Sequence, residues 1–221
     1  MKNLPDNSLT DAAFGSQALF AALAELAGTF FLTLAALTVA PPLTSYAVSL
    51  TLLVFVYIIG GLSGSHLNPA VTVGLVASRR FPLGKGVAFI AAQMLGALVA
   101  RLVAGHGLGT LPGNYSAGTV GAEFLGFGIL MLAVVATTDK QVSKSGSGLA
   151  VGGALLAGLL VSKGILNPAV GLAMGLGATP AVWAPLLSGV VFALLFSLFE
   201  RAKPATVPAQ EAKPVVRLAN S

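Results

Sequence analysis

Two copies of the tripeptide Asn-Pro-Ala are the residues in this chain whose types and spacing suggest a chemical role. The copies are Asn68-Pro69-Ala70 and Asn167-Pro168-Ala169. Asn is a favoured helix N-cap and Pro is favoured at the first helical position, so each copy predicts the start of a helix. The primary amide of Asn can also donate hydrogen bonds to the oxygen of an uncharged molecule. The chemistry indicated is the orientation of a neutral solute, without any covalent step.

The helix that follows Asn68 is expected to be short, because a basic, Pro-containing turn occupies 79–82. From Asn68 to about Ser78 it would measure roughly 15 Å, half of the ~30 Å hydrocarbon core of a bilayer. Each Asn-Pro-Ala copy comes after an apolar segment, with a short link between them. Two half-length helices are therefore the feature that the rest of the chain has to position.

Composition places the chain in a lipid bilayer. Of its 221 residues, 56% are hydrophobic and 9% are charged, and the mean hydropathy is +0.90, whereas a soluble domain carries about 25% charged residues. With no Cys and two His, no nucleophile–base set and no metal site can be assembled, so neither enzyme activity nor a cofactor is expected. The net charge of +5 reflects basic residues at the ends of apolar segments rather than a nucleic-acid partner.

Six apolar segments are predicted as membrane spans. They are 19–40, 46–62, 86–105, 120–138, 147–161 and 183–199. The polar residues 1–17 are interpreted as a leader and residues 201–221 as a flexible tail. The predicted fold class is an all-α membrane protein with six spans and two half-helices.

The two halves of the chain, 18–110 and 111–200, are predicted to be an internal duplication. The two Asn-Pro-Ala copies lie 99 residues apart (167 − 68), and two Glu-x-x-Gly patterns, at Glu25 and Glu123, lie 98 apart (123 − 25). Because each half has three spans, an odd number, the halves must cross the membrane in opposite orientations, as in inverted-repeat transport proteins. With both termini in the cytoplasm, ten of the twelve Lys and Arg face that side, as the positive-inside rule favours.

In this topology the two half-helices enter from opposite faces and meet near the midplane. Irregular backbone at that depth is tolerated where it lines a wet cavity, so the links before Asn68 and Asn167 predict a pore. Two helix N-termini place a partial charge of roughly +0.5 each at its centre, which disfavours cations and hydronium. The predicted function is a passive channel for water or small neutral solutes.

The chain resembles the aquaporin, or major intrinsic protein, family over roughly residues 18–200. Besides the two Asn-Pro-Ala copies and the two Glu-x-x-Gly patterns, the shared motifs are His66-x-Asn68, Gln93-x-x-Gly96-Ala97 and Pro185-x-x-x-Gly189. The resemblance implies a right-handed six-span bundle with two re-entrant half-helices. It also implies a homotetramer with one pore per subunit, surrounded by lipid in the plasma (inner) membrane.

The chain departs from the family pattern at Val170, because family members usually carry Arg directly after the second Asn-Pro-Ala. By resemblance, the outer selectivity filter is formed by Val48, Leu155, Gly164 and Val170. A short link before Asn167 leaves Leu159, one helical turn away, as an alternative to Leu155. An apolar filter of this kind favours less polar solutes, such as glycerol, urea or ammonia, and Lys163 is a candidate for a substitute charge at the outer mouth.

Three polar residues outside the filter are interpreted through the same resemblance. Glu25 and Glu123 are expected to support the loop backbone before each half-helix, and His66 is expected to shape the loop near the inner pore mouth. The alternative for the two glutamates is a proton-coupling role in an ion-coupled secondary transporter. A neutral-solute channel with little water flux and a non-conducting membrane scaffold are further alternatives. Arg101 is expected to extend its charge to the membrane interface.

Overall fold

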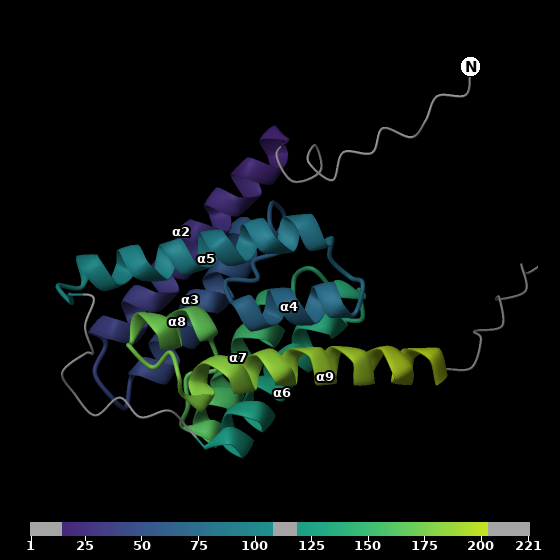
Figure 1. Ribbon diagram of the computed structural model, residues 1–221. Helices are drawn as coiled ribbons and strands as arrows, with labels where there is room; N and C mark the ends of the chain where they lie inside the picture. Colours follow the sequence, from purple (N-terminus) through teal and green to yellow (C-terminus); the bar gives the residue numbers. More distant parts are fainter. Residues whose placement is uncertain (1–14, 108–118, 203–221) are drawn as a thin grey trace, which may run out of the picture.

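The computed structural model describes residues 15–107 and 119–202, and within them the chain forms eight α-helices and no strand (Figure 1). The helices are α2 (Ser16–Thr38), α3 (Thr44–Ile59), α4 (Pro69–Ala77), α5 (Leu83–Val103), α6 (Val120–Thr138), α7 (Ser147–Ser162), α8 (Pro168–Ala173) and α9 (Pro180–Ala202). The predicted leader and tail lie outside the described residues, apart from positions 15–17 and 201–202 at the ends of α2 and α9. The prediction of an all-α protein is confirmed.

The six predicted spans correspond to helices of two lengths. The longer helices, α2, α5, α6 and α9, have 19 to 23 residues and are apolar enough to cross a membrane. The shorter helices, α3 and α7, are also apolar but contain 16 residues each, or about 24 Å. Each of the short helices is the one that leads into a half-helix. Hydrogen-bonded turns continue α3 to Gly64, whose N–H donates to Gly60 O at 3.1 Å, and Lys163 ends α7 in the left-handed conformation.

The two half-helices begin as the Asn-Pro motifs predict. The Asn68 side chain accepts a hydrogen bond from Ala70 N at 2.9 Å, and the Asn167 side chain accepts one from Ala169 N at 3.1 Å. Both Asn therefore act as N-caps, and each following Pro occupies the first helical position. The helices differ in length, since α4 has nine residues and α8 has six.

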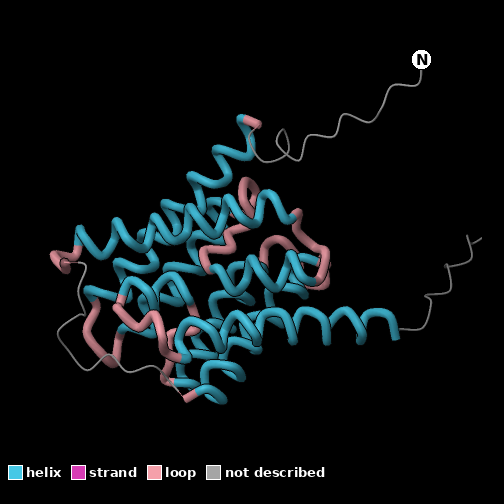
Figure 2. Tube along the Cα trace, viewed as in Figure 1, coloured by secondary structure: helices cyan, strands magenta, loops and turns pink. Residues whose placement is uncertain are grey.

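Each half-helix packs against a long helix of the other half of the chain. In the view shared by Figures 1 and 2, the short helices α4 and α8 lie between the long helices α5 and α9. Helix α4 packs on α9, and α8 packs on both α9 and α5. Glycine makes the first of these contacts possible, because a Cβ built on Gly189 of α9 would lie 2.5 Å from Ala70 O of α4. The second is made by small side chains, with Ala97 of α5 in one cluster with two alanines of α8.

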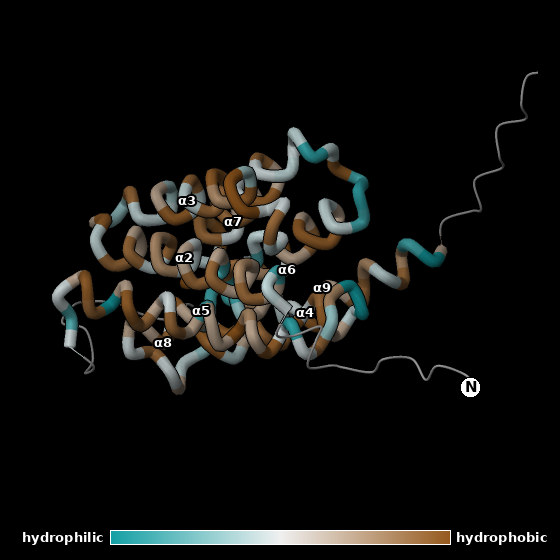
Figure 3. The backbone as a smooth tube through the Cα atoms, turned by 90° about the horizontal axis from the view of Figure 1, so that it is seen from above, coloured by the Kyte–Doolittle hydropathy of each residue, from teal (hydrophilic) through white to brown (hydrophobic). Residues whose placement is uncertain are grey.

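The outside of the bundle is apolar and much of its polar content is inside. Hydrophobic positions run along the helices, while hydrophilic positions gather mainly at helix ends and loops (Figure 3). Large apolar side chains point outward, including Phe20, Phe31, Ile58, Leu98 and Leu198. Glu25, Gln93 and Glu123 are 0% exposed. This arrangement suits lipid rather than water as the surrounding medium.

Candidate pore and its lining

The two Asn side chains join the half-helices at their N-terminal ends. Asn68 Nδ2 donates to Leu166 O at 2.8 Å, and Asn167 Nδ2 donates to Leu67 O at 2.9 Å. Each amide thus caps its own helix through oxygen and binds the link before the other helix through nitrogen. A primary amide carries two N–H groups, so one N–H of each Asn stays without a partner among the residues that the structure describes. Both Asn line the same cavity.

Glu25 holds the first link through four hydrogen bonds. Its Oε1 accepts from Ser63 Oγ at 2.7 Å and His66 N at 2.9 Å, and its Oε2 accepts from Leu67 N at 2.7 Å and Gln93 Nε2 at 2.8 Å. These donors are buried and would otherwise lose hydrogen bonding to water. The carboxylate therefore fixes the backbone immediately before Asn68.

Glu123 occupies the corresponding place in the second half. Its carboxylate accepts from Ile165 N and Leu166 N, both at 2.9 Å. Two non-glycine residues in each link have positive φ: Ser65 and Leu67 in the first, Lys163 and Leu166 in the second. The left-handed conformation is unfavourable for such residues, so it requires support from the surrounding structure. Neither glutamate lines the cavity that contains the two Asn.

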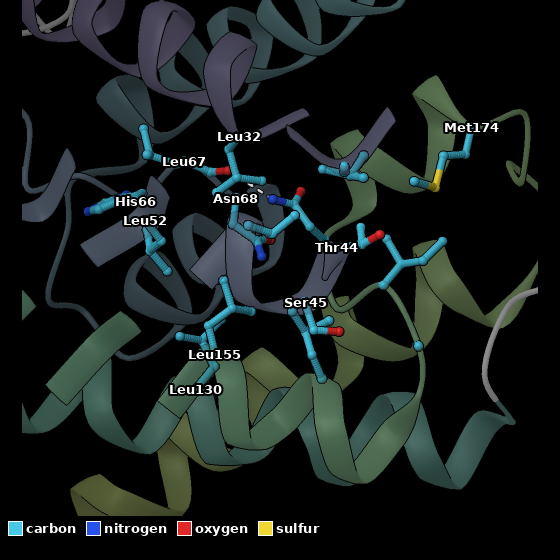
Figure 4. A pocket seen from close by; sticks show the side chains of 17 residues that line it. Leu32, Thr44, Ser45, Leu52, His66, Leu67, Asn68, Leu130, Leu155 and Met174 are labelled. Carbon is cyan, nitrogen blue, oxygen red and sulfur yellow. Dashed lines mark hydrogen bonds between the residues drawn. The ribbon is translucent and has the colours of Figure 1, made fainter. Parts of the chain in front are cut away.

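A narrow cavity of about 70 Å³ brings the predicted filter and the predicted pore centre together. Val48, Leu155, Gly164 and Val170 line it together with both Asn. Leu159 lines it as well, so both candidates on α7 border the same space. Met174 lies at one end of the view in Figure 4 and His66 at the other, with Thr44 and Ser45 nearer to Met174. Of the described residues in this lining, none is Asp, Glu, Lys or Arg.

Several lining residues were not identified from the sequence. They are Leu32, Ala36, Thr44, Ser45, Leu52, Leu67, Leu130, Ile165 and Met174. Leu32 and Leu130 are 98 residues apart (130 − 32), the same offset as the two glutamates, so the repeat itself carried the signal for this pair. Thr44, Ser45 and Leu52 lie three or four residues from Val48, which places them on the same face of α3.

A wider cavity of about 760 Å³ meets the narrow one at Leu52, His66 and Leu130. Its lining includes Arg80, Lys140 and Lys144, three of the residues that the charge distribution assigns to the cytoplasmic side. His66 stands at the junction, where its Nδ1 lies 3.1 Å from Thr72 Oγ1 and its ring packs edge-on against Phe81 and Phe89.

Two basic residues were assigned roles from the sequence. Lys163 is exposed and does not line the narrow cavity, and its role as a substitute charge at the outer mouth stays a prediction. Arg101 was expected to reach the membrane interface, but it is buried and donates to Gly107 O and Ala173 O. Two carbonyl oxygens of the protein thus accept hydrogen bonds from the guanidinium, which keeps it inside the bundle. Across 15–107 and 119–202 there is no group of three or more His, Cys, Asp or Glu that could hold a metal ion.

Comparison with known proteins agrees with this architecture. The family described as Major intrinsic protein matches residues 12–199. The aquaporin NIP1-1 of Oryza sativa subsp. japonica is 35% identical over 199 residues, covering 78% of this chain and 70% of the relative. Nodulin-26 of Glycine max is 31% identical over 199 residues, covering 78% and 73%.

Among solved structures, the X-ray structure of the aquaglyceroporin from Plasmodium falciparum has a TM-score of 0.64 to this chain at 22% identity. The match covers 84% of this chain and 100% of that one. It confirms the predicted aquaporin-like fold. Taken with the family match over residues 12–199, it shows that this chain belongs to the major intrinsic protein family of membrane channels.

Proposed function

We propose that this chain is a passive channel for water and small neutral solutes such as glycerol, urea or ammonia, and that it excludes ions and protons. The observation that carries the proposal is the pair of Asn side chains in the narrow cavity. Each has one N–H committed to the opposite link and one left without a partner in the described residues. Two such donors suit the oxygen of an uncharged solute.

Exclusion of cations is supported by the charges around that point. The N-termini of α4 and α8 meet there, and each contributes positive partial charge. No carboxylate among the described lining residues of the narrow cavity offsets this potential. A cation would have to leave water without gaining an anionic partner, which is strongly unfavourable.

The selectivity among neutral solutes is assigned to Val48, Leu155 and Val170. These three side chains are apolar, and all border the narrow cavity. An apolar ring replaces few of the hydrogen bonds that water loses on entry, so solutes with more carbon are less disadvantaged. For this reason, a neutral-solute channel with little water flux is the second candidate function, after a channel that conducts both water and solutes.

The proposed setting is a homotetramer in the plasma (inner) membrane with both termini in the cytoplasm. The orientation is supported by the basic residues that line the wide cavity, Arg80, Lys140 and Lys144. The exposed apolar side chains on the helices supply surface for lipid and for neighbouring subunits.

Stopped-flow light scattering on proteoliposomes tests the proposal. An impermeant osmolyte should shrink vesicles faster than protein-free ones, and a glycerol, urea or methylammonium gradient should then give re-swelling. Replacing Asn68 with Ala should reduce both, since it removes the donor and the helix cap together. Re-swelling without faster shrinkage would identify the solute channel with little water flux.

Three further results would contradict the proposal. If the vesicles change volume no faster than protein-free ones in any of these gradients, a non-conducting scaffold becomes the explanation. Flux that rises with an imposed proton gradient would identify a coupled transporter, and proton leakage through the unsubstituted chain, followed with an internal pH dye, would disprove the exclusion.

A further inference from the structure

Arg101 is a buried charge that the pore itself does not use. It lies in the last turn of α5 and is 3% exposed. A cation within a membrane protein is costly unless it is well partnered, so its partners indicate its role. Nε donates to Gly107 O at 2.6 Å, and Nη1 donates to Ala173 O. The first contact is local in the chain, whereas the second reaches the opposite half.

Ala173 is the last residue of α8, and its carbonyl is one that a helix end leaves without an intrahelical donor. The N–H groups of residues 174–176 donate to Val170, Leu172 and Gly171. None of these N–H groups donates to Ala173 O, and the guanidinium supplies the missing donor. A cation is also favoured there by the negative end of the helix dipole.

Contacts between α5 and α8 other than Arg101 are made largely by small side chains. Ala97 of α5 packs in one cluster with Ala169 and Ala173, and Met94 borders it. Arg101 follows Ala97 by four residues, so both lie on the α5 face that meets α8. Methyl groups allow close approach but make no directional contact. The hydrogen bond from Arg101 is directional, and it lies at the end of this contact.

We propose that Arg101 is a positioning residue that fixes the C-terminal end of α8 and thereby sets the width of the narrow cavity. Val170, which lines that cavity, precedes Ala173 by three residues, or about one helical turn. The N-terminal end of α8 is held separately, by the Glu123 contacts to the link and by the bond from Asn167 to Leu67 O. Arg101 itself does not line the cavity, so it acts on the solute only through α8.

The inference rests on the proposed channel function and names a residue that controls its selectivity. Without the guanidinium, the C-terminal end of α8 would keep its packing against α5 and α9 but lose this directional contact, so Val170 and Met174 could move away from Val48. The expected consequence is weaker discrimination between neutral solutes of different size. A role in folding alone would lower the number of working channels and leave the ratio of two solute permeabilities unchanged.

The chain supplies a matched control at Arg201. It lies in the last turn of α9, as Arg101 lies in the last turn of α5, and the two are 100 residues apart (201 − 101), close to the repeat offset. Arg201 is exposed. Arg201→Leu therefore makes the same chemical change at the corresponding place in the other half, without removing a buried contact.

The test compares xylitol and glycerol re-swelling of proteoliposomes for the unsubstituted chain, R101L, R101K and R201L. R101L should raise the xylitol-to-glycerol ratio on the order of tenfold, the lower end of what one methylene of pocket size changes. R101K keeps a donor for Ala173 O and should fall between R101L and the unsubstituted chain, and it replaces R101L as the deciding variant if R101L does not fold. R201L should leave the ratio unchanged. An unchanged ratio in R101L and R101K would overturn the inference.

Hydrogen–deuterium exchange of residues 168–177 in detergent provides a readout that does not require conduction. Exchange there should be faster in R101L than in R201L, while exchange of residues 69–77 should be the same in both. If the unsubstituted chain conducts neither solute, the proposed function fails, and this measurement alone decides the positioning role. Equal exchange of 168–177 in the two variants would then disprove it.

Discussion

Replacing Glu25 with Gln separates a structural role of this residue from a role in proton coupling. The carboxylate accepts from four donors: Ser63 Oγ, His66 N, Leu67 N and Gln93 Nε2. Gln has nearly the same shape but only one acceptor oxygen, and its NH₂ group is itself a donor. In either orientation of the amide, that NH₂ group faces two of the four donors.

The magnitude follows from counting which donors can turn away. Ser63 can rotate its hydroxyl, and Gln93 retains its bond to Thr72 Oγ1 at 3.0 Å. The backbone N–H groups of His66 and Leu67 cannot move without moving the link, so one of them is left buried and unsatisfied. That costs about 1–3 kcal/mol, and for a chain of this size it lowers the melting temperature by about 2–12 °C.

Thermal unfolding in detergent measures this change, with Glu200→Gln as the control. Glu200 is half-buried near the end of α9, where it accepts from Gln141. A substitution there should stay within about 0.5 kcal/mol, or roughly 2 °C. A melting temperature for E25Q equal to that of E200Q would refute the reasoning. Retained stability together with loss of a proton-gradient dependence would instead support the coupling role.

Two more substitutions test the pore and the packing around it. Val170→Arg places a guanidinium in a cavity of about 70 Å³. Glycerol flux, measured by stopped-flow, should therefore fall by about tenfold, and water flux should fall by less. An equal loss of the two fluxes would argue against a filter at this position. Gly189→Ala puts a Cβ 2.5 Å from Ala70 O and should cost about 1–3 kcal/mol through overpacking. Gly153→Ala is its control, because a Cβ there meets nothing within 4 Å; equal melting temperatures for the two alanine variants would contradict the close approach of α4 and α9.

The elements that were predictable are those with local signals. Asn68 and Asn167 combine a cap preference with the Pro that follows, and this combination identified both half-helix starts without knowledge of the fold. The membrane spans were also predictable from local sequence, because bilayer thickness sets the length of the apolar segment that each span needs. The family match over residues 12–199 confirms the resemblance that these motifs supported.

The features that were missed depend on contacts between distant parts of the chain. Arg101 was expected at the interface, because hydropathy at a helix end carries no information about a carbonyl such as Ala173 O in the other half. Leu155 and Leu159 lie one turn apart on α7, and both line the narrow cavity, so spacing alone did not separate them. Leu32 and Leu130 could have been identified as a pair of lining residues only by applying the repeat offset to apolar positions as well as to motifs.

The reciprocal bonds between the two Asn side chains have a consequence for biosynthesis. Asn68 donates to Leu166 O and Asn167 donates to Leu67 O, so each half of the chain provides the acceptor for the other. When the ribosome has delivered the first three spans to the translocon, the partners of Asn68 and Leu67 have not yet been made. The Asn68 amide and Leu67 O therefore gain these partners only after residue 167 has been synthesised, so the centre of the channel is completed late in synthesis.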